Sequence, residues 1–273
     1  MQSLSQIKAL LAQRGLVPRK RFGQNFLHDH NLIRKLVARS GIAPGDLVLE
    51  VGPGTGALTE ALWELGAEVI ACELDRDMAG ITRERWEAWP AKSAAFTLIE
   101  GDCLDGKRAL SPQIDAALAG RPFRLVANLP YGAATPLLAT LASERPDCLG
   151  QFVTIQREVA DRLCAKPGCG EYGPLSVIVR VFARVEQIST LPGSCFWPEP
   201  DVQSAMVAVE PLAPRPAVDP ASLTTLLHSL FSKRRKQIGA TLGRERTLPT
   251  GATHTMRPEE LSPEQFVALL GST

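Results

Sequence analysis

The sequence LVLEVGPGTGA at residues 47–57 decides the fold of this chain. An apolar run breaks into glycines at positions 52, 54 and 56, which predicts a buried strand, a tight turn and the start of a helix. Glycine tolerates positive φ and has no Cβ, so a ligand can pack directly on the backbone of such a turn. The motif therefore predicts a cofactor site at the carboxyl end of a buried strand.

Strand-like runs and helical periods alternate after this motif. Together they predict an α/β fold with a doubly wound, mostly parallel sheet. Four prolines between Pro211 and Pro220 predict a linker. We therefore expect one domain over residues 1–210, with a basic helical N-terminal extension, and a small helical domain within 211–273. The expected strands are 47–51, 68–73, 95–100, 123–127, 150–155, 175–185 and 204–210, and the expected helices are 57–65, 76–88, 135–142 and 156–165.

Composition places the chain among ordinary soluble globular proteins, with 273 residues, 45% hydrophobic and 22% charged. No apolar run approaches the ~20 residues that cross a bilayer, and the first residues lack the apolar core of a secretory signal. We therefore expect a cytoplasmic protein that does not bind membranes. The six cysteines are scattered and the four histidines lack zinc spacing, which predicts reduced thiols and no metal site.

Positive charge is concentrated in two blocks, although the net charge is only +1. Residues 1–40 carry eight basic side chains against one acid, residues 228–246 carry six against one, and residues 50–120 are acidic. Such an asymmetry can form a local phosphate-binding face, whereas the alternative is that each block is a solvated helix face. The predicted phosphate contacts are Arg19, Lys20, Arg21, Lys233, Arg234, Arg235 and Lys236, of which two or three of the last four would act from a helix.

An acidic residue ends or follows each of three consecutive predicted strands. Glu50 precedes the glycine turn. Glu73 ends the next strand, where an acid can accept both hydroxyl hydrogens of a ribose. Asp102 follows the third strand, where it can accept from an adenine amino group. This ordered series outweighs the alternative that each acid is a helix cap or an exposed loop carboxylate.

This pattern resembles the class I S-adenosylmethionine methyltransferases. The resemblance implies a Rossmann-like sheet and S-adenosylmethionine as the cofactor, with S-adenosylhomocysteine as the product. Because a sulfonium cofactor has no pyrophosphate, the turn formed by Gly52, Gly54 and Gly56 would contact its amino-acid part and its ribose.

A second motif, Asn128-Leu-Pro-Tyr131, follows the strand predicted at 123–127. The exocyclic nitrogen of adenine is conjugated with its ring, so it needs acceptors for its N–H groups and accurate aim rather than a strong base. The Asn128 side-chain oxygen and the Leu129 carbonyl are the predicted acceptors, Pro130 makes the turn rigid, and Tyr131 stacks on the base. The alternative is an ordinary Asn-x-Pro turn with a surface tyrosine.

Over most of its length the chain resembles the ribosomal RNA adenine dimethyltransferase family of KsgA type. The resemblance implies that Phe196 is the second aromatic wall of the base pocket, opposite Tyr131. Gly132 departs from the family's common asparagine, which is expected to loosen the loop after Tyr131, and Gln203 departs from a frequent aspartate. The motifs are RKRFGQNFL at 19–27, EVGPGTG at 50–56, ELDRD at 73–77, Asp102, NLPY at 128–131, IQREVADRL at 155–163, YGPLSV at 172–177, FWPEPDVQS at 196–204 and FSKRRKQI at 231–238. The implied cofactor residues are Asn25, Leu27, Gly52, Glu73, Asp102 and Asn128.

This resemblance implies a monomeric enzyme that dimethylates two adjacent adenosines in a hairpin of small-subunit (16S) ribosomal RNA, acting on the pre-30S subunit during ribosome biogenesis. One alternative is a resistance-type methylase of large-subunit ribosomal RNA. Another is a non-catalytic assembly or transcription factor of the same family. The basic helical domain and the Phe-x-Pro-x-Pro-x-Val-x-Ser motif favour the small-subunit activity. The glycine turn, Glu73 and Asn128 argue against a protein that has lost catalysis.

Overall fold

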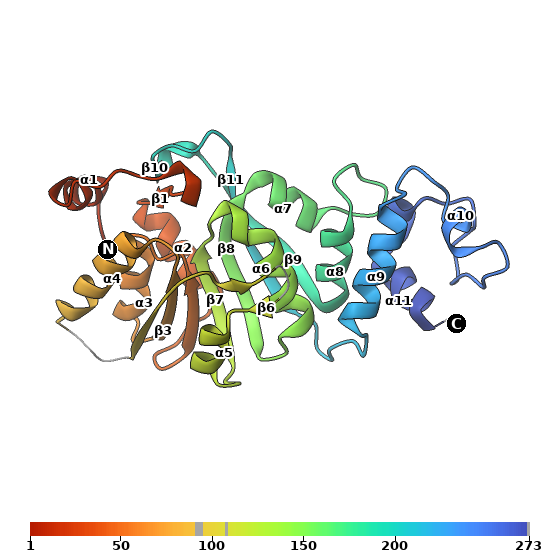
Figure 1. Cartoon of the computed structure of the whole chain (residues 1–273), viewed down its shortest axis with the longest axis horizontal. Helices are drawn as coiled ribbons and strands as arrows, with labels where there is room; N and C mark the ends of the chain where they lie inside the picture. Colours follow the sequence, from red (N-terminus) through yellow and green to blue (C-terminus); the bar gives the residue numbers. More distant parts are fainter. Residues whose placement is uncertain (91–94, 107–108, 272–273) are drawn as a thin grey trace.

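A seven-stranded sheet forms the centre of the computed structural model, which describes residues 1–90, 95–106 and 109–271 and, for Lys20, the backbone alone (Figure 1). The strands lie in the order β4-β3-β2-β7-β8-β11-β9. The first five are parallel to one another, and β11 pairs antiparallel with β8 and β9. The predicted doubly wound, mostly parallel sheet is therefore confirmed. The strands are β2 Leu47–Val51, β3 Glu68–Glu73, β4 Phe96–Glu100, β7 Phe123–Asn128, β8 Cys148–Gln156, β9 Ala183–Leu191 and β11 Ser204–Pro211.

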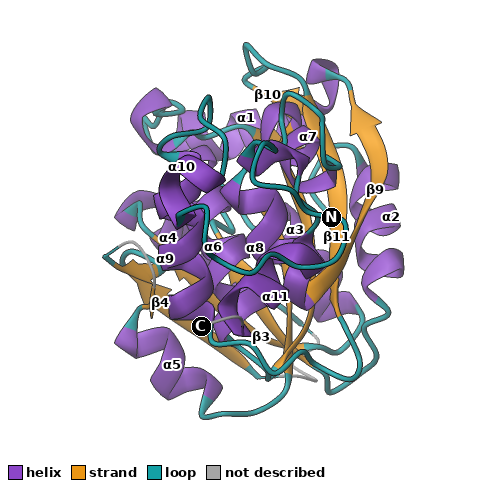
Figure 2. Cartoon of the chain, turned by 90° about the vertical axis from the view of Figure 1, so that its right-hand side faces the viewer, coloured by secondary structure: helices purple, strands orange, loops and turns teal. Residues whose placement is uncertain are grey.

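Helices cover both faces of the sheet, because successive residues of a strand point to opposite sides. Val48 and Val126 share one buried cluster with α2 and α3, whereas Leu49 and Leu125 share another with α5, α6 and α7. Figure 2 shows α2 on one side of the sheet and α6 and α8 on the other. Burial of both faces explains why the central strands β2 and β3 are mostly apolar, whereas the outer strands β4 and β9 are partly exposed. These helices are α2 His30–Ser40, α3 Ala57–Glu64, α5 Pro112–Leu118, α6 Tyr131–Glu144 and α7 Arg157–Cys164.

The N-terminal segment packs beside the carboxyl ends of the strands, where the glycine turn lies. Helix α1 (Leu4–Gln13) buries Ile7 and Leu11 against α4 (Arg76–Glu87). Further along, β1 (Phe26–Leu27) pairs antiparallel with β10 (Phe196–Trp197). This short ladder places Leu27 opposite Phe196, although the two residues lie far apart in the sequence. The ladder therefore brings the predicted cofactor and base sites together.

The strand expected at 175–185 is wrong for most of its length. Residues Pro174–Phe182 form helix α8, and the chain enters β9 only at Ala183. Pro174 occupies the first helical turn, where a proline is well tolerated, and the Ser176 hydroxyl accepts from the Gly173 backbone N–H at 3.1 Å. Most of the α8 side chains are buried and several are β-branched, and the two polar residues, Ser176 and Arg180, stand four apart, a spacing that fits an alternating strand as well as a helix.

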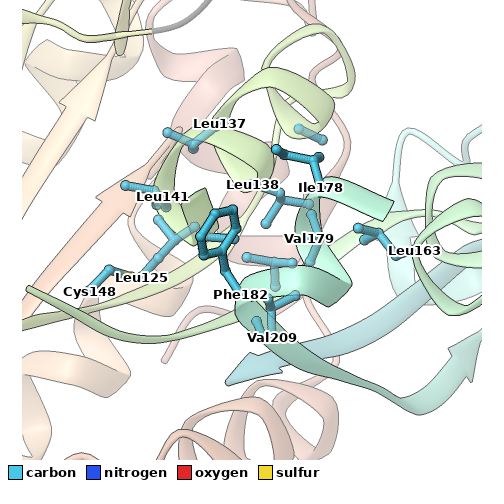
Figure 3. Packing of buried hydrophobic residues seen from close by; sticks show 14 of the residues in the cluster. Leu125, Leu137, Leu138, Leu141, Cys148, Leu163, Ile178, Val179, Phe182 and Val209 are labelled. Atoms are coloured by element: carbon cyan, nitrogen blue, oxygen red, sulfur yellow. The ribbon is translucent and has the colours of Figure 1, made fainter. Parts of the chain in front are cut away.

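The C-terminal helices share a core with the sheet. Leu227 on α9 and Phe266 on α11 belong to the same buried cluster as Leu138 on α6 and Phe182 on α8. Figure 3 shows the Phe182 ring within this packing, close to Leu138 and Val209. The boundary between domains near residue 210 stays a prediction. The elements of this region are α9 Pro220–Phe231, α10 Gly239–Leu242, η3 Pro258–Glu260 and α11 Pro263–Gly271.

A short hairpin completes the regular structure beside the sheet. It is formed by β5 (Leu104–Asp105) and β6 (Ala109–Leu110), which pair antiparallel. Figure 1 shows α9, α10 and α11 at one end of the molecule and α1 and α4 at the other. In the part of the chain that the structure describes, no helix has both the length and the apolar character needed to cross a membrane.

Candidate active site

A cavity of about 1040 Å³ lies at the carboxyl ends of the parallel strands. After β2 the chain adds β3 and then β4 on one side of β2, and it later adds β7 and β8 on the other side. The strand order therefore reverses between β2 and β7. Open α/β sheets bind ligands at this point. Residues 21–27 of the N-terminal segment form one wall. The predicted residues Asn25, Leu27, Gly52, Gly54, Glu73, Asp102, Asn128, Pro130 and Tyr131 all line this cavity.

The glycine turn packs too closely on its neighbours to carry side chains. Gly52 has a φ of 74°, and a Cβ at this position would lie 2.9 Å from Cγ of Pro130. Gly54 has a φ of 58°, and its Cβ would lie 3.0 Å from Cε1 of Phe26. Gly56 is the N-cap of α3. The described residues that line the cavity do not include it. The first two glycines therefore shape the cavity, and the third shapes the helix start.

The Glu73 carboxylate joins the glycine turn to the end of β3. Its Oε2 accepts from the Gly54 backbone N–H at 3.1 Å, and its Oε1 accepts from the Asp75 backbone N–H at 2.9 Å. Burial raises the pKa of Glu73, whereas these two hydrogen bonds oppose the rise. Each oxygen keeps acceptor capacity towards the cavity, so the carboxylate can still bind a pair of hydroxyl groups.

Glu50 is a buried carboxyl group to which the sequence analysis assigned a position but no ligand. Its side chain lines the cavity, is 1% exposed, and has no hydrogen-bond partner for Oε2 among the described residues. Burial raises the pKa of Glu50 to about 8; the Thr59 hydroxyl opposes this rise and the charge of Glu73 adds to it. A buried acid with one unpaired oxygen fits a ligand that carries positive charge, because such a charge would lower the raised pKa of the acid. Its position directly before the glycine turn was the available clue.

A second, small cavity of about 10 Å³ adjoins the first and has room for one water molecule. Phe196 reaches it from β10, and Tyr131 reaches it from the start of α6. Burial raises the pKa of the Tyr131 phenol, so this group is neutral near pH 7. A purine is larger than this cavity, so side chains must move apart to admit one. Of the predicted catalytic residues, Asn128, Leu129, Tyr131 and Phe196 line it, together with Gly23, Asn25, Thr154, Ile155 and Ser204.

Asp102 and Leu74 lie at the open side of the larger cavity. Asp102 is exposed, and its Oδ1 accepts from the Leu104 backbone N–H at 3.0 Å. Leu74 is 52% exposed and lines the cavity directly after Glu73. A large apolar side chain in this position offers a surface for a flat ring. Leu74 was not among the residues predicted from the sequence, because a leucine at a strand end carries no distinctive chemistry.

The basic residues of the N-terminal segment are partly engaged within the protein. Arg19 pairs with Asp75 at 3.0 Å and with Asp77 at 2.6 Å. Gln24 also donates to Asp75, at 2.8 Å, so these bonds tie the cavity wall to the start of α4. Arg21 is exposed, with its guanidinium 4.6 Å from the centre of the Phe22 ring. The side chain of Lys20 lies outside the described part of the structure, so its predicted role stays open.

The basic residues 233–236 follow a helix and do not belong to one, so their predicted helical placement is wrong. Helix α9 ends at Phe231, and the backbone continues in tight turns with Lys233 N–H donating to Leu230 at 3.1 Å. Arg234 donates to the Gly170 carbonyl at 2.8 Å, and its Nε lies 3.7 Å from the Glu259 carboxylate. No apolar side chain at 233–236 can pack to continue the helix. Lys233, Arg235 and Lys236 are exposed.

Two thiols line the cavity, but the described residues form no metal-binding group there. Within the described ranges, no group of three or more His, Cys, Asp or Glu side chains could hold a metal ion. Cys72 and Cys103 line the cavity as free thiols, and burial raises the pKa of each to about 12. Both thiols are therefore un-ionised near neutral pH and poor nucleophiles.

Comparison with known proteins identifies the family. Residues 16–270 match the family model described as ribosomal RNA adenine dimethylase. This chain belongs to that family. The ribosomal RNA small subunit methyltransferase A of Leptothrix cholodnii is 39% identical over 260 residues, which cover 93% of this chain and 91% of the relative. The protein of the same name from Hahella chejuensis is 38% identical over 261 residues, covering 92% and 91%.

Solved structures agree with this membership of the dimethylase family. A dimethyladenosine transferase from Plasmodium falciparum is 25% identical, with a TM-score of 0.73, covering 90% of this chain and 96% of that chain. The 23S rRNA methyltransferase ErmE is 24% identical, with a TM-score of 0.64 and coverage of 91% and 99%. The second likeness shows a shared fold.

Two positions where this dimethylase departs from the expected family pattern have clear structural settings. The loop expected after Tyr131 is wrong, because Tyr131 begins α6 and Gly132 is the second residue of this helix. A Cβ at Gly132 would meet no atom within 4 Å. The side chain of Gln203 accepts from Arg157 at 2.6 Å, and its carbonyl accepts from the Arg157 backbone N–H at 2.9 Å. Gln203 therefore still holds the start of α7, whereas Gly132 leaves open space beside Tyr131.

The close packing of Gly52 predicts a large effect of adding one methyl group. Gly52→Ala should destabilise the protein by about 1–3 kcal/mol, because alanine is strained at this φ and its Cβ meets Pro130. Urea unfolding measures this change. Gly80→Ala is the matched control, since Gly80 lies within α4 and a Cβ there meets nothing within 4 Å. The free energy of unfolding of this control should rise by about 0.5–1 kcal/mol, because alanine favours the helix over glycine. Wild-type stability of Gly52→Ala would refute the packing argument.

The raised pKa of Glu50 predicts a pH-dependent stability. The folded chain keeps a proton on Glu50 up to pH about 8, whereas the unfolded chain releases it near the ordinary value of 4.5. The contribution of this group to stability therefore falls as pH rises between these values and is constant above them. The free energy of unfolding of Glu50→Gln should therefore rise, relative to that of the wild type, by up to about 1.4 kcal/mol per pH unit from pH 6 to 8.

Urea unfolding of both proteins from pH 6 to pH 9 measures this difference. Glu171→Gln, at an exposed position, is the control and should show a constant difference from the wild type. A constant difference for Glu50→Gln over the same range would mean that Glu50 is already ionised in the folded protein.

Proposed function

We propose that this protein transfers methyl groups from S-adenosylmethionine to the exocyclic amino nitrogens of two adjacent adenosines in a hairpin of small-subunit ribosomal RNA. Each adenosine becomes dimethylated, and the reaction takes place on a pre-30S particle during ribosome biogenesis. We further propose that the enzyme acts in the cytoplasm as a monomer. The family membership and the names of the relatives at 38–39% identity support this assignment.

One observation carries the proposal. Asn128 lines both cavities, and so stands between the larger cavity at the glycine turn and the small aromatic cavity. A group-transfer enzyme needs its two reactants to meet across such a boundary, because methyl transfer requires the donor carbon and acceptor nitrogen in line and in contact. The larger cavity suits the cofactor, and the smaller, once opened, suits a flipped base.

The residues of the larger cavity fit S-adenosylmethionine. When bound, this cofactor supplies an electrophilic methyl group. Glu73 would bind the ribose hydroxyls, Asp102 the adenine amino group, and the backbone of Gly52 and Gly54 the amino-acid part. Glu50 keeps its proton in the empty site near pH 7; a cationic ligand would lower its pKa, so that Glu50 would release the proton to solvent and supply a counter-charge. Asn25 and Leu27 would close the site from the N-terminal segment.

The chemistry at the base requires aim and acceptors. The Asn128 side-chain oxygen and the Leu129 carbonyl would accept the two N–H groups of the adenine, which directs the nitrogen lone pair at the methyl group. Pro130 holds the turn, and Tyr131 and Phe196 would hold the ring between them. The Tyr131 phenol is neutral and is not needed as a base, because the proton leaves only after the nitrogen has become positively charged.

Phosphate contacts would come from exposed basic side chains on both flanks of the cavity. Arg21 in the N-terminal segment and Lys233, Arg235 and Lys236 in the turns after α9 are exposed. Lys20, of which the structure describes the backbone alone, would add a further contact. Arg19 and Arg234 have partners inside the protein, so an RNA contact by either would compete with an existing ion pair. The remaining contacts would supply affinity without reading sequence.

Asn128→Ala tests the proposed mechanism. Turnover should fall roughly a hundredfold or more, because its acceptor matters most as the amino nitrogen attacks. The affinity for RNA should change far less. The assay uses labelled cofactor and small subunits from an unmethylated strain, with the product identified as dimethyladenosine. Asn31→Ala, at an exposed position on α2, is the control.

Each alternative function predicts a different result in this assay. Labelling of large subunits in preference to small ones would support the resistance-type activity. Absence of transfer by the wild type to either subunit would support a non-catalytic factor. Near-normal turnover of Asn128→Ala would refute the acceptor mechanism while leaving the substrate assignment in place.

The exposed basic side chains after α9 predict a salt-dependent RNA affinity. Replacing Lys233, Arg235 and Lys236 by glutamine should weaken binding at moderate salt and leave cofactor binding intact. The slope of log affinity against log salt should flatten by about 0.7–0.9 for each phosphate that the variant no longer neutralises. Arg234→Gln is the matched control, because it removes the hydrogen bond to Gly170 and should reduce stability with a smaller effect on the slope. A wild-type slope in the triple variant would identify a solvated surface.

A further inference from the structure

Two hydrogen bonds from different parts of the chain hold the side-chain amide of Asn128. Its Nδ2 donates to the backbone carbonyl of Asn25 at 2.9 Å. Its Oδ1 accepts from the Thr154 hydroxyl. Asn25 comes from the N-terminal segment, whereas Thr154 lies on β8, in register with Asn128 on β7. The amide is therefore held at both ends.

These bonds decide which way the amide faces. A carbonyl can only accept, so the Asn25 oxygen requires the nitrogen end of the amide on its side. With that bond alone, the Asn128 amide could still rotate to some extent about its Cβ–Cγ bond, because this torsion has no sharp minimum. The Thr154 hydroxyl adds a second point and so defines the plane of the amide. Oδ1 has two lone pairs, and the one left over remains available to the small cavity that Asn128 and Thr154 both line.

Thr154 also touches the second proposed acceptor. Its backbone carbonyl accepts from the Leu129 N–H at 3.0 Å. One fully buried residue, with 0% exposure, therefore contacts both residues whose oxygens would receive the adenine amino group. Its hydroxyl is a polar group in the core of the sheet, and such groups are retained when they hold a specific partner.

We propose that Thr154 is a positioning residue for methyl transfer, which orients the Asn128 carboxamide towards the base. This inference rests on the proposed function. It adds a residue that carries no chemistry itself and acts through Asn128. The Leu129 contact is made by the backbone, so substitutions at Thr154 test the side-chain bond alone.

Three variants separate positioning from packing. Thr154→Val keeps the shape and removes the hydroxyl, whereas Thr154→Ser keeps the hydroxyl and removes a methyl group. Ser40→Ala removes an equally buried hydroxyl in α2, one that donates to the Val37 carbonyl at 2.6 Å. The single-turnover rate of methyl transfer to unmethylated small subunits is measured at saturating RNA and cofactor. Cofactor affinity and KM for RNA are measured for the same proteins.

Thr154→Val should slow the single-turnover rate roughly three- to tenfold, the effect of removing one neutral hydrogen bond. KM for RNA and the dissociation constant of the cofactor should stay within about twofold of the wild type. Thr154→Ser should restore the rate, and Ser40→Ala should match the wild type. A wild-type rate for Thr154→Val, or equally slow valine and serine variants, would overturn the proposal.

A crystal structure of Thr154→Val tests the same idea without any assay of activity. The Asn128 amide should rotate away from its wild-type plane or occupy two orientations. If the wild type fails to methylate small subunits but the amide is displaced in the variant, the proposed function fails and the positioning role stands. If the amide keeps its single orientation, the positioning role fails whatever the enzyme methylates.

Discussion

The contact between Gly52 and Pro130 is the constraint on which the rest of the site depends. A Cβ at position 52 would stand 2.9 Å from the proline ring, so only a residue without a side chain lets these two loops meet. They follow β2 and β7, the strands that flank the reversal of the sheet. One loop carries the glycine turn after Glu50, and the other carries Asn128 and its neighbours. The two cavities adjoin because these loops touch.

Two buried carboxyl groups, of which one is only partly paired, are the second feature of the site. Glu50 and Glu73 both have a raised pKa because they are removed from water, yet only Glu73 has hydrogen bonds to both of its oxygens. Such a burial disfavours the charged form of Glu50 in the empty protein, whereas a bound cation would favour that form. Sites that bind ligands often retain such unfavourable groups, because stability and function make different demands.

The N-terminal segment connects the two cavities and is itself anchored by charge. Arg19 pairs with Asp75 and Asp77 at the start of α4, which holds the following residues against the cavity. A few residues later, the Asn25 carbonyl holds the Asn128 amide, and Leu27 pairs with Phe196. Part of the basic block in this segment therefore stabilises the site itself. Charge counts along the sequence cannot separate this use from a contact with RNA.

Local chemistry in the sequence determined the sheet and most of the cavity lining. The apolar runs ending at the glycine turn, at Glu73 and at Asn128 were recognisable because parallel strands are buried on both faces and their ends gather at one edge. Only the tertiary structure decided the features that depend on distant partners. Residues 174–182 form a helix that packs against α6, α9 and α11, and these partners lie too far away in the sequence to be read from the local pattern. The pairing of β10 with β1 brings Phe196 to the small cavity that Tyr131 also lines, and Oε2 of Glu50 has no partner among the described residues. Contacts between remote segments such as these have no signature in local sequence.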